Sequence, residues 1–551
     1  MLFLFFSLVK CVLTVPFRGI FVLGDEAFYM ETAKTIWFHL QFSNLGNPYP
    51  PGYPLVIAPA QFFFPDFTTV YHTVLIANSF LSSLVVFPAY YLSRKFLDIP
   101  VSAFLAVLIL VLPLTFLYSF VVMSENLFIP LYAFSCWVII EAFTRDDSRL
   151  WALCGAILFF MVFTRSIGIA AVIAILIVIV YEAYTSENRS RSIVAKWPIG
   201  VFFVLPLVLY LAWNYLFFHD VFSLMNGGLF GYSTENYAQS FLTILWGTGG
   251  VITIGKIILN EAGYYLLAGF FLIVIFAFYG LIGKRLFRSE EKSRSFVILF
   301  LYTFVTSLVL VLISTAHLAA FYAPFGYTLL MGRYLEPTIP ILCILGVTGY
   351  AQYAHFTTKT RTDSGLLVAV FSVLFVMFVL LMPLQGYKWI NTLMLYDFIF
   401  FQQFQVAAGI RGFYLLLAIM YGAGVGIILA RNVRFLILFG MVLSLISLAV
   451  IYPVMLDFSS RTADTMEDTG EMARILASVQ HDRLTLYDQD LMTSSRGTNL
   501  FYCTQWWTGG RVVQASTDSI DKGYSYVLSG KDLPYESLAY SNNLNVTLYR
   551  T

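Results

Sequence analysis

Long apolar segments recur along almost the whole chain, and they constrain the fold more than any other feature of the sequence. Of the 551 residues, 59% are hydrophobic and only 11% are charged, and the mean hydropathy is +0.79. Soluble domains carry about 25% charged residues, so this composition is typical of a chain that crosses a bilayer many times. We therefore predict an α-helical polytopic membrane protein.

Thirteen segments reach or approach the roughly 20 apolar residues that a bilayer-spanning helix needs. They are residues 1–17, 70–93, 101–118, 122–143, 150–165, 167–184, 197–218, 262–283, 295–316, 336–354, 365–385, 409–430 and 433–455. The first segment is short, contains Lys10 and lacks a small-residue cleavage site, so we expect a short first helix rather than a signal peptide. A start site placed too far downstream would also explain its length.

The basic residues of the short loops predict the orientation. With a cytoplasmic N-terminus, sixteen Lys and Arg residues fall in inner loops and seven in outer loops. Cytoplasmic loops are enriched in these residues, so we predict a multi-pass protein of a plasma or other cell membrane with an extracytoplasmic C-terminal end. Of the two N-x-S/T sequons, Asn188 then lies inside and stays unmodified, whereas Asn545 lies outside and can carry a glycan.

The composition changes sharply near residue 457. We therefore divide the chain into a transmembrane domain over residues 1–456 and a small soluble extracytoplasmic α/β domain over residues 457–551. In the second domain, residues 466–480 have the pattern of a helix, and short strands are predicted over residues 483–488, 511–516, 524–530 and 544–550.

The first external loop, residues 18–69, contains the acidic stretch "GDEAFYMETAK". We expect an interfacial helix over residues 25–40, with Asp25 as its N-cap. One face would carry Tyr29, Ala33, Ile36, Trp37 and Leu40, and the others Glu26, Glu31, Lys34 and Thr35. The four prolines of "NPYPPGYPL", residues 47–55, predict an ordered, non-helical turn into the next span. A second external loop, residues 218–261, is long enough to cover a cleft.

Polar side chains gather at the external ends of the predicted spans. They are Asp25, Glu26, Glu125, Arg165, His317, Arg333 and Tyr334. Carboxylates and arginines at one depth suit a reaction at the boundary between water and lipid. Apart from Lys10, no ionisable residue is expected near a midplane, which argues against an ion-coupled transporter.

These residues together resemble the GT-C superfamily of membrane glycosyltransferases. The most similar group contains the protein O-mannosyltransferases, the aminoarabinose transferases of lipid A and RgtA/B/C/D-like enzymes. The motifs that carry the resemblance are Asp25-Glu26 before a helix, "PPGYP" before the second span, "MSENLF" around Glu125, "TRSIG" around Arg165, and "GRYLEPTIP" around Arg333 and Tyr334. The resemblance covers roughly residues 18–345, and the span layout extends it to residue 455.

The resemblance implies a GT-C fold and an inverting transfer of sugar. The donor would be a polyprenyl- or dolichyl-phosphate sugar, and the acceptor a hydroxyl on a protein, a glycan or a lipid. Asp25 would be the general base and Glu125 a second acid in the cavity, while Arg333 and Arg165 would neutralise the lipid phosphate. General chemistry agrees, because a carboxylate can accept a hydroxyl proton and arginine matches phosphate geometry. Each residue also has a structural alternative, such as a helix cap or a headgroup anchor.

Two further charged residues are candidates for the same site. Glu26 is a site acid, a ligand with Glu125 for an optional divalent metal, or a solvated neighbour. Lys34 is a candidate phosphate contact. In the aminoarabinose transferases a lysine precedes the double proline, but Tyr49 occupies that position here.

Three aromatic or imidazole side chains complete the candidate site, namely Tyr53, His317 and Tyr334. Tyrosines and lone histidines at this depth are often structural, and this alternative stays open. Near the C-terminus, "QWWTGGR" is similar to the WWDYG motif of oligosaccharyltransferases but lacks its Asp-Tyr pair, so Trp506 and Trp507 are expected to pack or to stack on sugar.

Other functions are weighed against this one. A flippase for lipid-linked glycans would share the outer cavity but should carry polar residues through the membrane to the inner side, and the apolar midplanes argue against that. An oligosaccharyltransferase would need the missing Asp-Tyr pair. Nucleic acid is not expected as a partner, because no basic patch with interleaved aromatics occurs. The five cysteines show no metal-ligand spacing, so neither a disulfide framework nor a zinc site is predicted.

Overall fold

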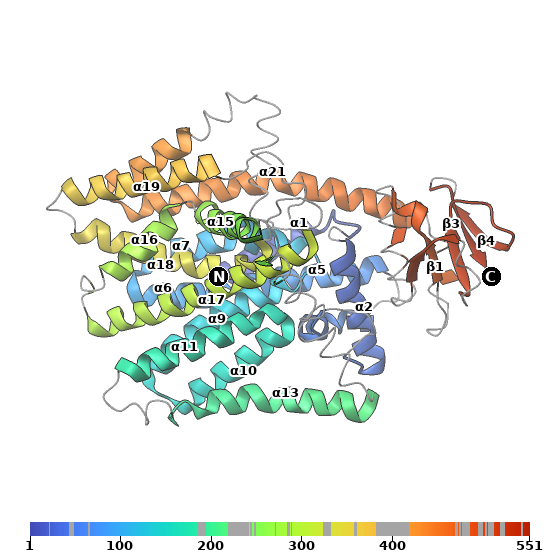
Figure 1. The fold of residues 1–551 in the computed structure, drawn as a ribbon, viewed down its shortest axis with the longest axis horizontal. Helices are drawn as coiled ribbons and strands as arrows, with labels where there is room; N and C mark the ends of the chain where they lie inside the picture. Colours follow the sequence, from blue (N-terminus) through green and yellow to red (C-terminus); the bar gives the residue numbers. More distant parts are fainter. Residues whose placement is uncertain are drawn as a thin grey trace. The chain divides into compact units, whose positions relative to one another are not determined.

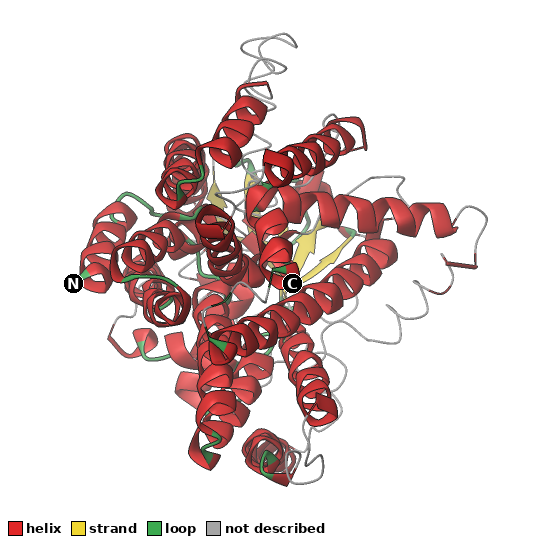
Figure 2. Cartoon of the chain, turned by 90° about the vertical axis from the view of Figure 1, so that its left-hand side faces the viewer, coloured by secondary structure: helices red, strands yellow, loops and turns green. Residues whose placement is uncertain are grey.

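Helices dominate the described part of the chain, and its strands are confined to one small sheet (Figure 2). The computed structural model describes residues 1–20, 23–42, 49–63, 67–185, 194–218, 250–269, 271–283, 289–322, 332–356, 361–381, 418–468, 485–493, 512–517, 524–541 and 544–551, and a few isolated positions between them.

The chain folds into two compact units. The first comprises Met1–Ser7, Phe80–Tyr118 and Ser124–Ile451, and the second comprises Leu8–Ser79, Ser119–Met123 and Tyr452–Thr551. The division at residue 456 that the composition suggests stays a prediction.

The first unit is helical (Figure 1). Its helices are α6 (Val86–Phe96), α7 (Ile99–Val111), α8 (Pro113–Phe116), α9 (Glu125–Arg145), α10 (Ser148–Thr164), α11 (Ile169–Thr185), α13 (Trp197–Phe218), α15 (Gly250–Ala268), α16 (Leu272–Ile282), α17 (Glu290–Tyr322), α18 (Ile339–Phe356) and α19 (Arg361–Leu381), with the 3-10 helices η2 (Ser166–Gly168), η6 (Gly332–Tyr334) and η7 (Glu336–Thr338). The second unit contains α2 (Leu23–His39), α3 (Gly52–Ile57) and α4 (Ala60–Phe63), and α1 (Leu2–Thr14), α5 (Phe67–Ser83), η1 (Leu117–Phe120) and α21 (Val433–Asp468) contribute to both units.

Several helices have the length and composition of membrane spans. Among the described residues, six qualify, or seven when α7 and the segment Pro113–Phe120, bent by 67° from it, are counted as one span. Five shorter apolar helices accompany them, among them α1, α10 and Ala418–Ala430. The protein is therefore a multi-pass membrane protein, and the count of thirteen spans stays a prediction.

The helices predicted on either side of Arg165 are present: the second has the length of a span over Ser166–Thr185, whereas the first, Ser148–Thr164, is a shorter apolar helix. α10 ends at Thr164, Arg165 is extended, and η2 and α11 follow directly. The single span predicted over residues 262–283 is wrong, because α15 ends at Ala268 and α16 begins at Leu272. Phe271 between them has φ 58°, in the left-handed region that interrupts a helix.

The loop predicted over residues 218–261 is also corrected, because α15 already begins at Gly250. Glu261 lies within this helix, is fully buried, and accepts a hydrogen bond of 2.9 Å from the Ser314 hydroxyl of α17. We placed Glu261 in a loop because its side chain is polar. In the structure, the hydrogen bond from Ser314 of α17 provides a buried partner for its carboxylate inside the protein.

The first-loop helix differs from its predicted form. α2 begins at Leu23, so Asp25 and Glu26 lie in its first turn and Asp25 is not the N-cap. Glu26 and Glu31 are buried, whereas Trp37 and Phe38 are exposed. Tyr29, Ala33 and Ile36 of the predicted apolar face are buried, whereas Leu40 on the same face is exposed, so the predicted sidedness is confirmed only in part.

The proline-rich stretch after α2 is non-helical at residues 49–51, as predicted, but helical from Gly52 onward. Gly52–Ile57 forms α3, preceded by Pro51 in helical geometry. Proline is tolerated in the first turn of a helix, where its missing N–H has no intrahelical partner.

α16 and α18 pack closely along glycines of α18 (Figure 1). A Cβ atom added at Gly349 would lie 1.8 Å from the carbonyl oxygen of Phe276, and one added at Gly346 would lie 2.4 Å from that of Ile273. Small residues let membrane helices approach in this way.

The second unit ends in a five-stranded mixed sheet of order β2-β1-β3-β5-β4. Its strands are β1 (Thr485–Asp488), β2 (Val512–Ala515), β3 (Tyr526–Ser529), β4 (Glu536–Ser541) and β5 (Val546–Arg550). β1 pairs in parallel with β2 and β3, and β5 pairs antiparallel with β3 and β4. Four strands match the predicted segments; β4, an edge strand with polar exposed positions, was not predicted. Of the helix predicted over residues 466–480, most positions lie outside the described residues.

Candidate active site

Three buried charged side chains from distant parts of the sequence meet in the first unit. Glu125 begins α9, Arg165 lies between α10 and η2, and Arg333 lies in η6. One carboxylate oxygen, Oε1 of Glu125, lies 2.5 Å from Nη1 of Arg165 and 3.0 Å from Nε of Arg333. The structure therefore brings together three residues that the sequence singled out separately. We call them the Glu125 cluster.

The Glu125 cluster is almost closed to solvent. The side chains of Glu125, Arg165 and Arg333 are 0%, 7% and 6% exposed. Buried ions lose several kcal/mol of hydration, which good geometry and pairing must offset. Within the cluster, two guanidinium groups face one carboxylate.

Aromatic rings lie against the arginines. The Arg165 guanidinium lies 5.5 Å from the ring centroid of Tyr334 and 6.0 Å from that of Phe128. His317 meets Tyr334 edge-on, with 5.5 Å between ring centroids. Cation–π contacts of this kind fix the plane of a guanidinium group. Tyr334 and His317, both candidates from the sequence, thus belong to the surroundings of the cluster.

A second buried carboxylate lies three residues after Arg333. Glu336 is fully buried and accepts hydrogen bonds from the hydroxyls of Tyr118, at 2.5 Å, and Tyr264, at 3.1 Å. The neighbouring Thr338 and Tyr265 hydroxyls lie 3.0 Å apart. Glu336 was not selected from the sequence, although an acid at the start of an apolar run was the signal that could have identified it.

In the second unit, the first turn of α2 presents two acids to different partners. The Tyr49 hydroxyl donates a hydrogen bond to Oδ1 of Asp25. Glu26 is fully buried and accepts hydrogen bonds from the backbone N–H of Val122, at 2.7 Å, and the Tyr71 hydroxyl, at 3.2 Å. Asp25 is thus held by a side chain, whereas Glu26 anchors a backbone segment. Tyr49, noted only as a departure from a family pattern, is the partner that the sequence did not reveal.

The remaining candidates lie around this turn. The Tyr53 hydroxyl donates to Oδ1 of Asn78 at 2.9 Å, and the Asn78 amide donates to the Val121 carbonyl at 2.9 Å. Lys34 lies one turn after Glu31, and burial lowers the pKa of its ammonium group while Glu31 raises it. Tyr53 is therefore part of the packing of α3, and Lys34 is paired electrostatically within α2.

The described residues do not support the optional divalent metal considered at Glu26 and Glu125. Among the described residues, no three His, Cys, Asp or Glu side chains lie together in a way that could hold a metal ion. Glu26 is bonded to Val122 and Tyr71, and Glu125 to two arginines.

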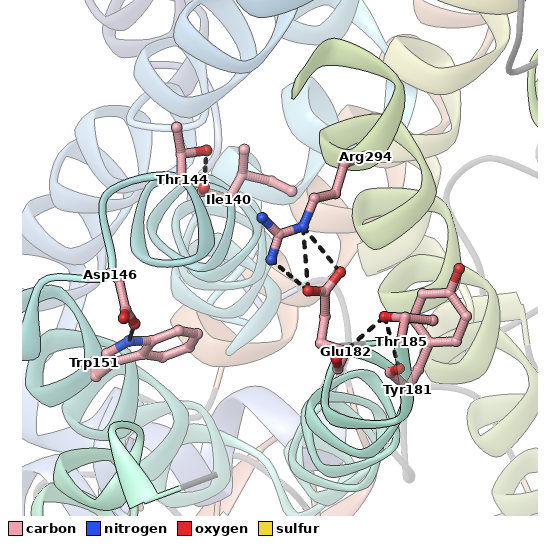
Figure 3. A network of polar contacts seen from close by, with 8 residues as sticks. All are labelled: Ile140, Thr144, Asp146, Trp151, Tyr181, Glu182, Thr185 and Arg294. Carbon is pink, nitrogen blue, oxygen red and sulfur yellow. Dashed lines mark hydrogen bonds and ion pairs between the residues drawn. The ribbon is translucent and has the colours of Figure 1, made fainter. Parts of the chain in front are cut away.

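Another acid–arginine pair lies near the opposite end of α9 (Figure 3). Nε of Arg294 lies 3.2 Å from both carboxylate oxygens of Glu182, and Nη2 lies 2.5 Å from Oε2. Thr144 of α9, 19 residues after Glu125, lines the same surface pocket as Arg294. At 1.5 Å per residue the two pairs are separated by about 30 Å along the helix.

Comparisons with known proteins agree with this architecture. Residues 50–213 match a family described as dolichyl-phosphate-mannose-protein mannosyltransferase, a range that contains Glu125 and Arg165. The fold is similar to ArnT from Cupriavidus metallidurans bound to undecaprenyl phosphate, with a TM-score of 0.52, 13% identity, and coverage of 100% of this chain and 97% of that one. No curated protein sequence matches the chain.

Two further solved structures are similar at TM-scores below 0.5. The first is apo ArnT from the same organism, with a TM-score of 0.49, 14% identity, and coverage of 100% of this chain and 97% of that one. The second is an oligosaccharyltransferase from Archaeoglobus fulgidus, with a TM-score of 0.45, 11% identity, and coverage of 96% of this chain and 69% of that one.

The apolar helices define a multi-pass membrane protein. Over residues 50–213 the chain is similar to a family of membrane glycosyltransferases, and its fold is similar to that of ArnT.

Proposed function

We propose that the protein is an inverting glycosyltransferase that moves a sugar from a polyprenyl-phosphate donor to an acceptor hydroxyl on the extracytoplasmic side of the membrane. The observation that carries this proposal is the Glu125 cluster, in which two buried arginines from separate elements are held at a single oxygen. Buried arginines are costly in a membrane protein and usually mark a functional site.

Arg165 and Arg333 are the proposed phosphate ligands. A lipid monophosphate leaves with the electron pair of the broken bond between the anomeric carbon and the phosphate oxygen. Guanidinium groups match phosphate oxygens in geometry and charge. Positive charge fixed where negative charge develops lowers the barrier, and more so where water is excluded.

Asp25 is the proposed general base. It takes the proton of the acceptor hydroxyl as the acceptor oxygen bonds to the anomeric carbon, and one displacement of this kind inverts the configuration. The hydrogen bond from Tyr49 orients the carboxylate. Such general-base assistance typically contributes about 10²–10⁴-fold to the rate.

The named relatives support the choice of donor. The matching family is described as using dolichyl-phosphate-mannose, and the ArnT structure contains undecaprenyl phosphate. Both are polyprenyl phosphates, so we propose this carrier class for the present chain. His317 and Tyr334 are assigned supporting roles beside the Glu125 cluster. Lys34 and Tyr53 are assigned supporting roles in the unit that contains Asp25, where Glu26 holds the backbone at Val122.

The test is transfer by the purified protein. A panel of radiolabelled polyprenyl-phosphate sugars is incubated with the protein in nanodiscs and a membrane extract, and the labelled product is located. Asp25→Asn should bind donor normally and lose transfer by about 10²-fold or more, because the amide cannot accept the proton. Normal transfer by this variant would remove Asp25 from the mechanism.

Two outcomes would favour the other functions. Movement of the labelled lipid across liposomes without a new glycosidic bond would indicate a flippase. Label on an Asn-x-Ser/Thr peptide would indicate an oligosaccharyltransferase.

A further inference from the structure

The geometry of the Glu125 cluster suggests more than a static ion pair. Both arginine contacts converge on the same oxygen, Oε1, while the second oxygen accepts a hydrogen bond of 3.3 Å from the Ser124 hydroxyl. A single oxygen between two guanidinium groups is also the arrangement that a phosphate oxygen adopts when two arginines bind it. Glu125 thus holds the position that an anionic ligand of Arg165 and Arg333 would take.

We propose that Glu125 is an internal competitor of the donor phosphate, which keeps the two arginines assembled when no donor is bound and reclaims them as the lipid phosphate leaves. This inference rests on the proposed function. It gives Glu125 a role in product release in place of acid–base chemistry.

The charges of the cluster explain why such a competitor is useful. Without Glu125, two guanidinium groups would lie together in a buried site with no carboxylate between them, a costly arrangement. They would also bind the released polyprenyl phosphate tightly, so the product would inhibit the enzyme. A carboxylate on the first turn of α9 supplies the counter-charge and limits the affinity for phosphate.

The experiment measures binding of polyprenyl phosphate by native mass spectrometry or by competition with a labelled lipid, in nanodiscs. Glu125→Gln keeps the shape and an oxygen acceptor but removes the competing charge. We expect it to bind polyprenyl phosphate about tenfold more tightly than the wild type, with a similar fall in kcat and stronger product inhibition. Equal or weaker binding by Glu125→Gln would overturn the proposal, because a residue that only positions the arginines gives that result.

Three matched variants make the outcome specific. Glu125→Asp keeps the charge and should retain an affinity close to that of the wild type, which also guards against a misfolded glutamine variant. Glu336→Gln removes a buried charge near the cluster whose partners are tyrosines, and Glu182→Gln breaks an acid–arginine pair at the other end of α9. Neither should tighten binding about tenfold, and a gain by either would mean that net charge, not exchange at Arg165 and Arg333, sets the affinity.

The same measurements separate this inference from the proposed function. Arg333→Gln should weaken binding of polyprenyl phosphate; if it does not, the arginines are not the phosphate ligands and the proposed function loses its central observation. If Arg333→Gln weakens binding but Glu125→Gln does not strengthen it, only the exchange role of Glu125 fails. A parallel titration with inorganic phosphate tells whether the cluster recognises the phosphate group alone or requires the lipid.

Discussion

At the scale of single residues, the first-loop helix contains a carboxyl group in an unusual environment. Glu31 of α2 is only 5% exposed, and burial raises its pKa from 4.5 to about 7, while the nearby Lys34 acts in the opposite direction. In the folded state the protonated form is therefore favoured. The stabilising contribution of this residue is complete below pH 4.5 and is lost as the pH rises to about 7.

Replacing Glu31 by glutamine should remove this pH dependence. The shift corresponds to about 3 kcal/mol of stability as an order of magnitude. We expect the melting temperature of the wild type in detergent to fall between about pH 4.5 and pH 7, and that of Glu31→Gln to change much less. Glu290→Gln, which removes an exposed carboxyl group from the first turn of α17, is the control and should keep the wild-type slope. An unchanged slope for Glu31→Gln would contradict the burial argument.

The candidate site shows which residue-level inferences a sequence supports. Glu125, Arg165 and Arg333 were selected because they fall at the external ends of predicted spans and in motifs that resemble the GT-C superfamily, and the structure brings these three into contact. Their mutual pairing, however, depends on the packing of α9, α10 and η6, which no local pattern encodes. Tyr49 was missed for the same reason, because its partnership with Asp25 spans a proline-rich segment and a whole helix.

At the scale of elements, the contact between α16 and α18 depends on the absence of side chains. Gly349→Ala would place a Cβ atom 1.8 Å from the Phe276 carbonyl oxygen, so one of the helices must shift. Overpacking of this kind costs about 1–3 kcal/mol. We expect a lower melting temperature in detergent for Gly349→Ala.

The matched control is a glycine on another helix. Gly365 lies in α19, and a Cβ atom added there meets nothing within 4 Å. Gly365→Ala should therefore leave the melting temperature unchanged or raise it slightly, because alanine favours the helix. Equal effects of the two substitutions would show that helix propensity, not the contact between α16 and α18, determines the result.

The predicted boundaries of helices agree with the structure where hydrophobicity alone determines them. They differ from the structure where packing against other elements determines them. The helices on either side of Arg165 were predicted to within two residues. The break between α15 and α16 was missed because both flanks are apolar, so the hydropathy profile runs through it. The edge strand β4 was missed because Glu536 and Ser537 are both exposed and a register shift between Ser537 and Ala539 interrupts the alternation.

At the scale of the whole molecule, the charge asymmetry of the loops predicts which side of the membrane each sequon faces. Asn188, which lies outside the described residues, follows α11 in a loop predicted to be cytoplasmic. Asn545 is exposed and lies between β4 and β5 with φ 52°. When the chain is expressed in a eukaryotic host, the predicted orientation exposes Asn545, but not Asn188, to the lumenal glycosylation machinery.

We therefore expect one endoglycosidase-sensitive gel shift, which disappears in Asn545→Gln and persists in Asn188→Gln. The physical reason is that each short basic loop favours the cytoplasmic side, so the biases of successive loops add along the chain. A glycan on Asn188 would reverse the orientation and place the Glu125 cluster on the side opposite to that proposed for transfer. The acceptor would then have to be a cytoplasmic molecule, and the proposed extracytoplasmic reaction would be wrong even if Asp25 and the arginines act as described.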